Sequence, residues 1–138
     1  MVKVDGPFRL VTPGTAPQNH PMTEVSDIGG YHAHVYFDAQ SLPQARALCE
    51  AARDTFGVQM GRVHERTVGP HPMWSCQLLF PAEKFATVVP WLHVHRNGLI
   101  VFVHTLTGDD LWDHTHGAMW LGESVALKLD MFELEDAD

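Results

Sequence analysis

The sequence predicts an α+β fold of the ferredoxin-like type: a βαββαβ antiparallel sheet with helices on one face, plus a C-terminal strand. Segments with a period of two and segments with a helical period alternate in that order. The chain of 138 residues has the length of one domain, and its 45% hydrophobic content suffices for a core. Residues 125–132 alternate once more and predict the added strand.

The first strand is predicted at residues 31–37. Alternation places Tyr31, Ala33, Val35 and Phe37 on one face and His32, His34 and Tyr36 on the other. A helix is predicted to follow, with Ser41 as its N-cap and Gln44 completing a capping box. Gly57 is expected to end this helix.

A β-hairpin and a second helix are predicted next. Residues 58–68 and 75–80 have strand character, and the prolines of the 69–72 segment predict the turn between them. The second helix is expected from Pro81 to about Arg96, bent or re-started near Pro90. Residues 99–105 predict the fourth strand, and residues 107–117 predict a polar loop or short helix.

Composition limits the setting and the partners. Prolines crowd residues 1–28, which predicts an N-terminal arm before a single domain at 29–138. The formal net charge of −8 argues against nucleic acid as a partner. Because the sequence has no membrane-length apolar run, no signal peptide and no disulfide framework, a cytoplasmic location is expected. Cys49 and Cys76 are expected to be buried, reduced residues.

Histidine is the residue type that points to function, with ten in the chain. The ferredoxin-like strand order 4-1-3-2 places the end of the fourth strand beside the start of the first. His104 should therefore lie beside His32 and His34, and imidazoles grouped in this way bind zinc, iron, copper or nickel. The hairpin residues His64, Glu65 and His71 lie at the far end of the simplest version of this topology, so their distance from the first group is left open.

Residues 30–122 resemble the DOPA 4,5-dioxygenase family of fungi and bacteria. The resemblance implies a ferredoxin-like fold, often dimeric, and extradiol cleavage of a catechol by a non-haem Fe(II) centre and O2. Thr105 stands where relatives usually have proline. The shared motifs are YHAHVYF at 31–37, GRVHE at 61–65, VGPHP at 68–72, WSCQ at 74–77, RNGL at 96–99, VHTLTGDD at 103–110, DH at 113–114 and WLG at 120–122.

These considerations lead to a predicted site. The metal ligands are His32, His34 and His104, and the metal is Fe(II), with zinc or another divalent ion as the alternative. His71 is the expected acid or base, His114 is the alternative for that role, and Glu65 joins the metal only if the hairpin folds inward. Tyr36 and Trp112 are predicted to contact the substrate.

Two functions from different classes fit these residues. The first is a ring-cleaving dioxygenase acting on a small catechol with O2. The second is a non-catalytic dimeric module that binds a metal or an aromatic ligand. A homodimer is expected in both cases, because a sheet with helices on one side leaves its other face to be covered.

Overall fold

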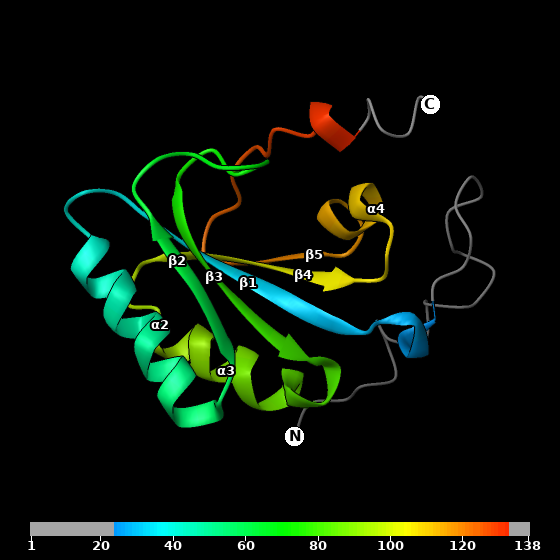
Figure 1. Ribbon diagram of the computed structural model, residues 1–138, viewed down its shortest axis with the longest axis horizontal. Coiled ribbons are helices and arrows are strands. Elements are labelled where there is room, and N and C mark those ends of the chain that lie inside the picture. The colour runs from blue at the N-terminus through cyan, green and yellow to red at the C-terminus, as the bar shows by residue number, and fades with distance from the viewer. Residues whose placement is uncertain (1–23, 133–138) are drawn as a thin grey trace, which may run out of the picture.

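The computed structural model describes residues 24–132, in which five antiparallel strands form one sheet (Figure 1). Two helices lie against one face of this sheet, and shorter segments lie over the other. The elements in chain order are η2 (Val25–Asp27), β1 (Gly30–Phe37), α2 (Leu42–Phe56), β2 (Gln59–His64), β3 (Trp74–Pro81), η3 (Ala82–Lys84), α3 (Phe85–His95), β4 (Ile100–Leu106), α4 (Asp110–His114) and β5 (Ala118–Leu121).

The predicted strand order is confirmed, and the predicted place of the last strand is wrong. The sheet runs β2-β3-β1-β4-β5, which contains the expected 4-1-3-2 order. The fifth strand is Ala118–Leu121, paired with β4, whereas residues 125–132 form no strand. Gly122 has a φ of 91° and turns the chain out of the sheet. The alternating residues that follow pack over the sheet instead of pairing with it.

The core lies between the sheet and the helices α2 and α3. Alternation along β1 gives Ala33, Val35 and Phe37 to this core and leaves the histidines on the opposite face, as predicted. Cys49 and Cys76 are buried free thiols in the same layer. Pro90 lies inside α3, which continues through it on the exposed side of the helix.

The predicted capping box at the start of α2 is wrong. The Ser41 side chain makes no cap hydrogen bond, and the Asp38 carboxylate instead accepts from the Ser41 backbone NH at 2.9 Å. The Gln44 amide donates to the Asn97 carbonyl at 2.8 Å, so it joins α2 to the turn before β4. Gly57 ends the helix with a φ of 72°, as predicted.

Segments of the same chain lie over the second face of the sheet. Figure 1 shows α4, the β2–β3 loop and the segment after β5 on the side opposite α2 and α3. The Lys128 backbone NH donates to the Pro70 carbonyl at 2.9 Å, which joins the last segment to the β2–β3 loop. Part of this face is therefore covered without a second subunit, and the homodimer stays a prediction.

The predicted arm falls almost wholly outside the described residues. Residues 1–23, which include His20, are not among them, and residues 24–28 contain η2. Between residues 24 and 132, no helix has the length and apolar character needed to cross a bilayer.

Candidate metal centre

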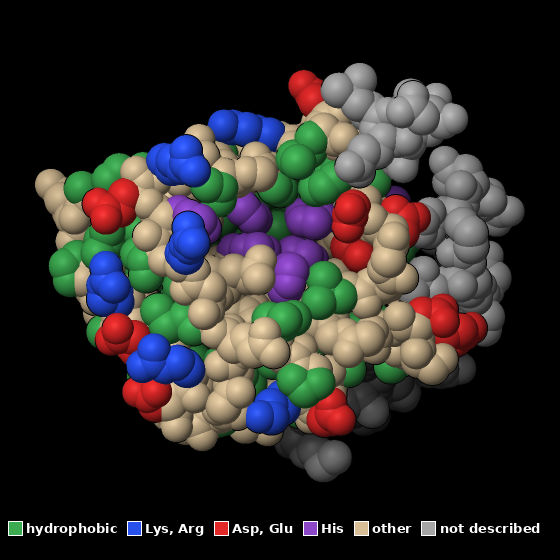
Figure 2. Space-filling view, viewed as in Figure 1, with side chains coloured by type: hydrophobic (Ala, Val, Ile, Leu, Met, Phe, Trp, Pro, Cys, Tyr) green, Lys and Arg blue, Asp and Glu red, His purple; other side chains and the backbone are tan. Residues whose placement is uncertain are grey.

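Strand register brings the three predicted ligands together. His32 lies directly opposite His104 in the β1–β4 pair, and His34 follows two residues later on the same face. One ligand atom from each of the three imidazoles lies within 4.8 Å of the others. The group stands in a hollow of the sheet face, where Figure 2 shows histidine side chains gathered together.

The spacing of the nitrogens fits a shared metal ion. The Nε2 atoms of His34 and His104 lie 3.1 Å apart. Two nitrogens that are each about 2.1 Å from one metal lie about 3.0–3.4 Å apart, depending on the angle between them. Three neutral imidazole donors suit iron, zinc or copper, so these residues fit a divalent transition metal.

A backbone hydrogen bond sets the tautomer of His104. The Nδ1 atom of His104 is 2.9 Å from the Thr105 carbonyl, which can only accept, so Nδ1 carries the proton. The lone pair of His104 is therefore on Nε2, the atom that faces His34. Metal-binding histidines are usually oriented in this way by a partner at the other ring nitrogen.

A buried carboxylate fastens the next helix to the end of β4. Asp113 is 1% exposed and accepts hydrogen bonds from the hydroxyls of Thr105 and Thr107, both at 2.8 Å. It also accepts from the backbone NH of Thr107 at 3.0 Å. Asp109 caps α4 by accepting from the Trp112 NH at 3.1 Å. These contacts position α4, and with it His114.

The β2–β3 loop folds inward and carries His71 to the site, which settles the distance that the sequence left open. The His71 ring centroid is 4.1 Å from that of His34. A hydrogen bond of 2.7 Å joins the Tyr36 hydroxyl to His71 Nδ1. Burial raises the pKa of Tyr36, so the phenol keeps its proton and can donate it to His71.

His114 contacts the group at His104, whereas His71 contacts it at His34. The His114 ring centroid is 4.1 Å from that of His104, and the His114 Nδ1 atom donates to the Asp110 carbonyl at 2.7 Å. The second nitrogen, Nε2, consequently carries the lone pair. The ring of Phe132 packs on His114 with a centroid distance of 4.5 Å.

Three other residues considered for the site have different surroundings. Glu65 is exposed and does not belong to the group of ligand atoms found in the described residues. His64 is half-buried at the end of β2, opposite Ser75. Trp112 stacks on His116 with a centroid distance of 6.0 Å. Its contact with a substrate stays a prediction.

Two aromatic residues that were not predicted as substrate contacts, Phe102 and Trp120, also lie against the site. Phe102 pairs with His34 across the β1–β4 ladder, and its ring stacks on Trp120 at 4.4 Å. Trp120 also meets Tyr36 edge to face at 6.1 Å. Period-two alternation places Phe102 on the face of His104, so that signal was present in the sequence. The pairing of β5 was needed to place Trp120.

Burial holds these histidines in the neutral form that binds metals. Desolvation lowers the pKa of His71 to about 4 and that of His104 to about 3. Repulsion from the neighbouring imidazoles, His114 foremost, adds to both effects. The pKa of His34 falls well below its usual value for the same first reason, with His71 the foremost neighbour.

These pKa shifts predict that the metal-free protein loses stability in acid. The unfolded chain takes up protons on its histidines near pH 6.5, and the folded chain resists this uptake. The free energy of unfolding should therefore fall as the pH drops below about 6.5, by up to about 1.4 kcal/mol per pH unit for each shifted histidine. Urea unfolding between about pH 7 and pH 4.5 measures this slope.

A pair of variants tests the origin of that slope. His71→Asn should make the slope shallower by removing one of the shifted histidines, whereas the exposed control His93→Asn should leave it unchanged. A free energy of unfolding that stays constant across the range would contradict the burial argument.

The fold and site together define a class: a ferredoxin-like α+β protein with a three-histidine group that could hold a metal on the sheet face opposite α2 and α3. The comparisons with known proteins identify the family. The model of the Dopa 4,5-dioxygenase family matches residues 31–131, and the chain belongs to that family.

The matched relatives are fungal and cyanobacterial. A DOPA 4,5-dioxygenase of Amanita muscaria is 33% identical over 86% of this chain, and an uncharacterized 21.2 kDa protein of Botryotinia fuckeliana is 33% identical over 75%. The chain spans 56% and 63% of the lengths of these two relatives. A crystal structure described as a "putative dioxygenase" from Nostoc punctiforme is 39% identical, with a TM-score of 0.71, over 85% of this chain and 100% of that one.

Proposed function

We propose that this protein is a non-haem Fe(II) extradiol dioxygenase acting on a small catechol. The observation that carries the proposal is the convergence of His32, His34 and His104, whose ligand atoms lie within 4.8 Å of one another. The match to the family and the likeness to the cyanobacterial structure support it.

The reaction would break the ring carbon–carbon bond beside the diol and place both atoms of O2 in the ring-opened product. The three imidazoles would hold Fe(II), which when bound supplies the redox chemistry with O2. The protein would contribute the positions of the diol and its protons. A catechol must lose protons as it binds a metal and regain one as the ring opens, so neutral imidazoles beside the diol are needed.

His71 is proposed as the group that moves these protons. In the tautomer in which Tyr36 donates to Nδ1, the ring proton of His71 is on Nε2 and is available to a substrate oxygen. His114, with its lone pair on Nε2, is the alternative on the other side of the group. Tyr36 and Trp112 are proposed as substrate contacts, Tyr36 through the same hydroxyl that holds His71.

The test is anaerobic loading of the full chain with Fe(II), followed by oxygen-electrode and absorbance measurements with catechol. Oxygen uptake together with a rising visible band of the ring-opened product is the expected result. His71→Gln should lower kcat by about 10²–10⁴-fold, the usual effect of removing a general acid or base. His93→Gln, an exposed histidine of α3, is the matched control and should keep full activity.

The same experiment separates this proposal from its rival. If Fe(II) binds in a 1:1 ratio but no catechol consumes oxygen, the protein is a metal- or ligand-binding module without turnover. Equal rates of turnover with Zn(II) in place of Fe(II) would also contradict the proposed redox role of the metal. The homodimer and the cytoplasmic location stay predictions.

A further inference from the structure

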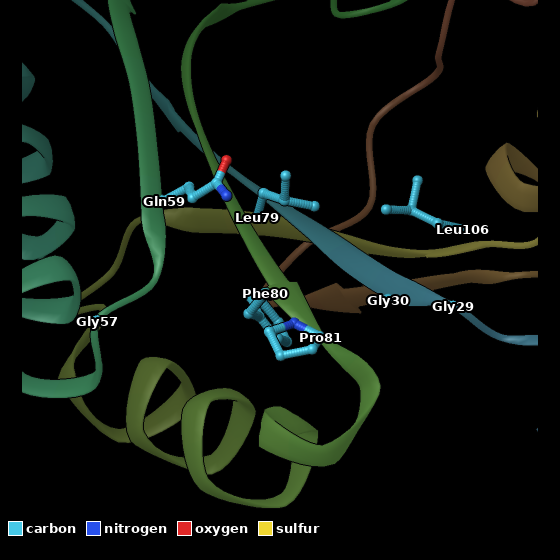
Figure 3. Close-up of a pocket in the computed structure, with 8 residues that line it drawn as sticks. All are labelled: Gly29, Gly30, Gly57, Gln59, Leu79, Phe80, Pro81 and Leu106. Atoms are coloured by element: carbon cyan, nitrogen blue, oxygen red, sulfur yellow. The ribbon is translucent and has the colours of Figure 1, made fainter.

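A pocket adjoins the histidine group on the same face of the sheet. It has a volume of about 280 Å³ and lies where β1 begins and β3 and β4 end (Figure 3). Gly30 pairs with Leu106 on one side and with Pro81 on the other. In Figure 3, the side chains of Gln59, Leu79 and Leu106 project to one side of the sheet, while Phe80 projects toward α3.

Strand register shows that this pocket continues from the metal centre. Leu79 lies directly opposite His32 in the β1–β3 pair, so a pocket-lining side chain borders a predicted ligand. Gly30 precedes His32 by two residues, which places it on the same face and roughly 7 Å further along the strand. A substituent on the far side of a catechol ring would be displaced from the diol by a comparable distance.

Because position 30 is glycine, no side chain extends from it into this pocket. A Cβ atom built there would lie only 2.9 Å from the Phe80 carbonyl oxygen, so the close approach of β1 and β3 requires glycine. The pocket consequently has backbone at its base and the apolar side chains of Leu79, Pro81 and Leu106 around it.

The lining selects the chemistry of its occupant. None of the eight lining residues is charged, and Gln59 supplies the one polar side chain among them. An ammonium placed there would lose hydration without gaining a partner of opposite charge among the lining residues. The Lys84 ammonium lies beside Gly57 at one margin of the pocket, where it already donates to the Phe56 carbonyl. An alkyl group would gain contact with leucine and proline. The volume is at the lower end of the ~300–1,000 Å³ typical of sites for drug-sized ligands, which suits a short group.

We infer that this pocket holds a short, uncharged alkyl substituent of the catechol, and that Leu106 and Leu79 determine this specificity. The inference rests on the proposed function and narrows its substrate class. It predicts that alkylcatechols are better substrates than catechols bearing the amino-acid side chain of DOPA. Each methylene that enters the pocket should raise kcat/KM by roughly fourfold, the effect of burying one CH₂ group.

The experiment compares catechol, 4-methyl-, 4-ethyl- and 4-propylcatechol and DOPA on the Fe(II)-loaded full chain. Steady-state kcat/KM is measured by oxygen uptake, and the affinity of each compound is measured separately by anaerobic calorimetry. The expected result is a rise along the alkyl series in both quantities, with DOPA below 4-propylcatechol. Leu106→Ala should reduce the ratio of 4-propylcatechol to catechol by about tenfold, because apolar contact is lost.

A folding defect would lower kcat/KM for all substrates alike. The ratio of kcat/KM between two substrates would therefore stay the same. Val94→Ala, which truncates an apolar side chain that is 75% exposed on α3, is the matched control and should leave the ratio unchanged. Leu106→Met conserves volume and should restore most of the alkyl preference.

The outcomes separate this inference from the proposed function. If catechol is cleaved but the alkyl chain has no effect, or DOPA is the better substrate, the pocket assignment is overturned and the dioxygenase stands. If no compound is cleaved but affinity rises along the series and falls in Leu106→Ala, the pocket assignment stands and ring cleavage is overturned. If affinity does not change along the series and nothing is cleaved, both are overturned.

Discussion

Replacing His34 with alanine is expected to abolish tight binding of a divalent metal by this chain. His34 is 4% exposed, and its Nε2 atom lies 3.1 Å from that of His104, so the substitution removes one of the three buried donors of the group and alanine supplies none in its place. Removing partners that only support metal ligands costs about 10–100-fold in affinity, so the loss of a ligand itself should exceed about 100-fold. Calorimetric titration with Fe(II) under anaerobic conditions, or with Zn(II) as a redox-stable probe, measures the loss.

The fold should survive this substitution, which makes the result interpretable. A buried imidazole that carries no charge contributes packing but no ion pair, and β1 remains paired on both sides. His104→Ala should behave like His34→Ala, whereas the exposed His95→Ala should bind metal as the unmodified protein does. Unchanged affinity in both His34→Ala and His104→Ala would show that the metal is held elsewhere.

Replacing Asp113 with alanine is expected to destabilise the protein by about 2–4 kcal/mol, the range for breaking a buried hydrogen-bond network around a charged group. The change leaves the hydroxyls of Thr105 and Thr107 and one backbone NH without their acceptor. It also releases α4, which carries His114 to the metal centre. Urea unfolding of the metal-free protein at neutral pH measures the loss.

Asp110→Ala is the matched control, because this carboxylate lies one turn away on α4 and is exposed. It should change the free energy of unfolding by less than about 0.5 kcal/mol. Equal effects of the two substitutions would show that the network around Asp113 does not stabilise α4. Thr105→Val, which removes a single donor, should fall between the two variants.

Strand residues were the part of the site that the sequence could predict. Period-two alternation assigned His32, His34 and Tyr36 to one face, and the strand order of the fold brought His104 to them. Both signals are local or topological, so they need no knowledge of side-chain packing. The resemblance to a family then gave these residues a chemistry.

Loop residues could not be placed in the same way. His71 reaches His34 only because the β2–β3 loop curls over the sheet, and the sequence contains no period that describes such a path. The error at residues 125–132 has a related cause. Alternation of Val125, Leu127 and Leu129 is typical of a strand, but it is equally satisfied by a segment that packs its apolar residues without a ladder.

Because the metal centre needs the native register of β1 against β4, metal binding also indicates that the chain has folded correctly. Slippage of β1 by one residue would turn its histidines toward the helices α2 and α3 and place Ala33 and Val35 on the opposite face. Such a chain could keep its helices and most of its strands, yet it would no longer bring His32 and His34 together with His104 around one ion. Stoichiometric metal uptake would thus distinguish the native pairing from compact misfolded forms that overall secondary-structure content cannot tell apart.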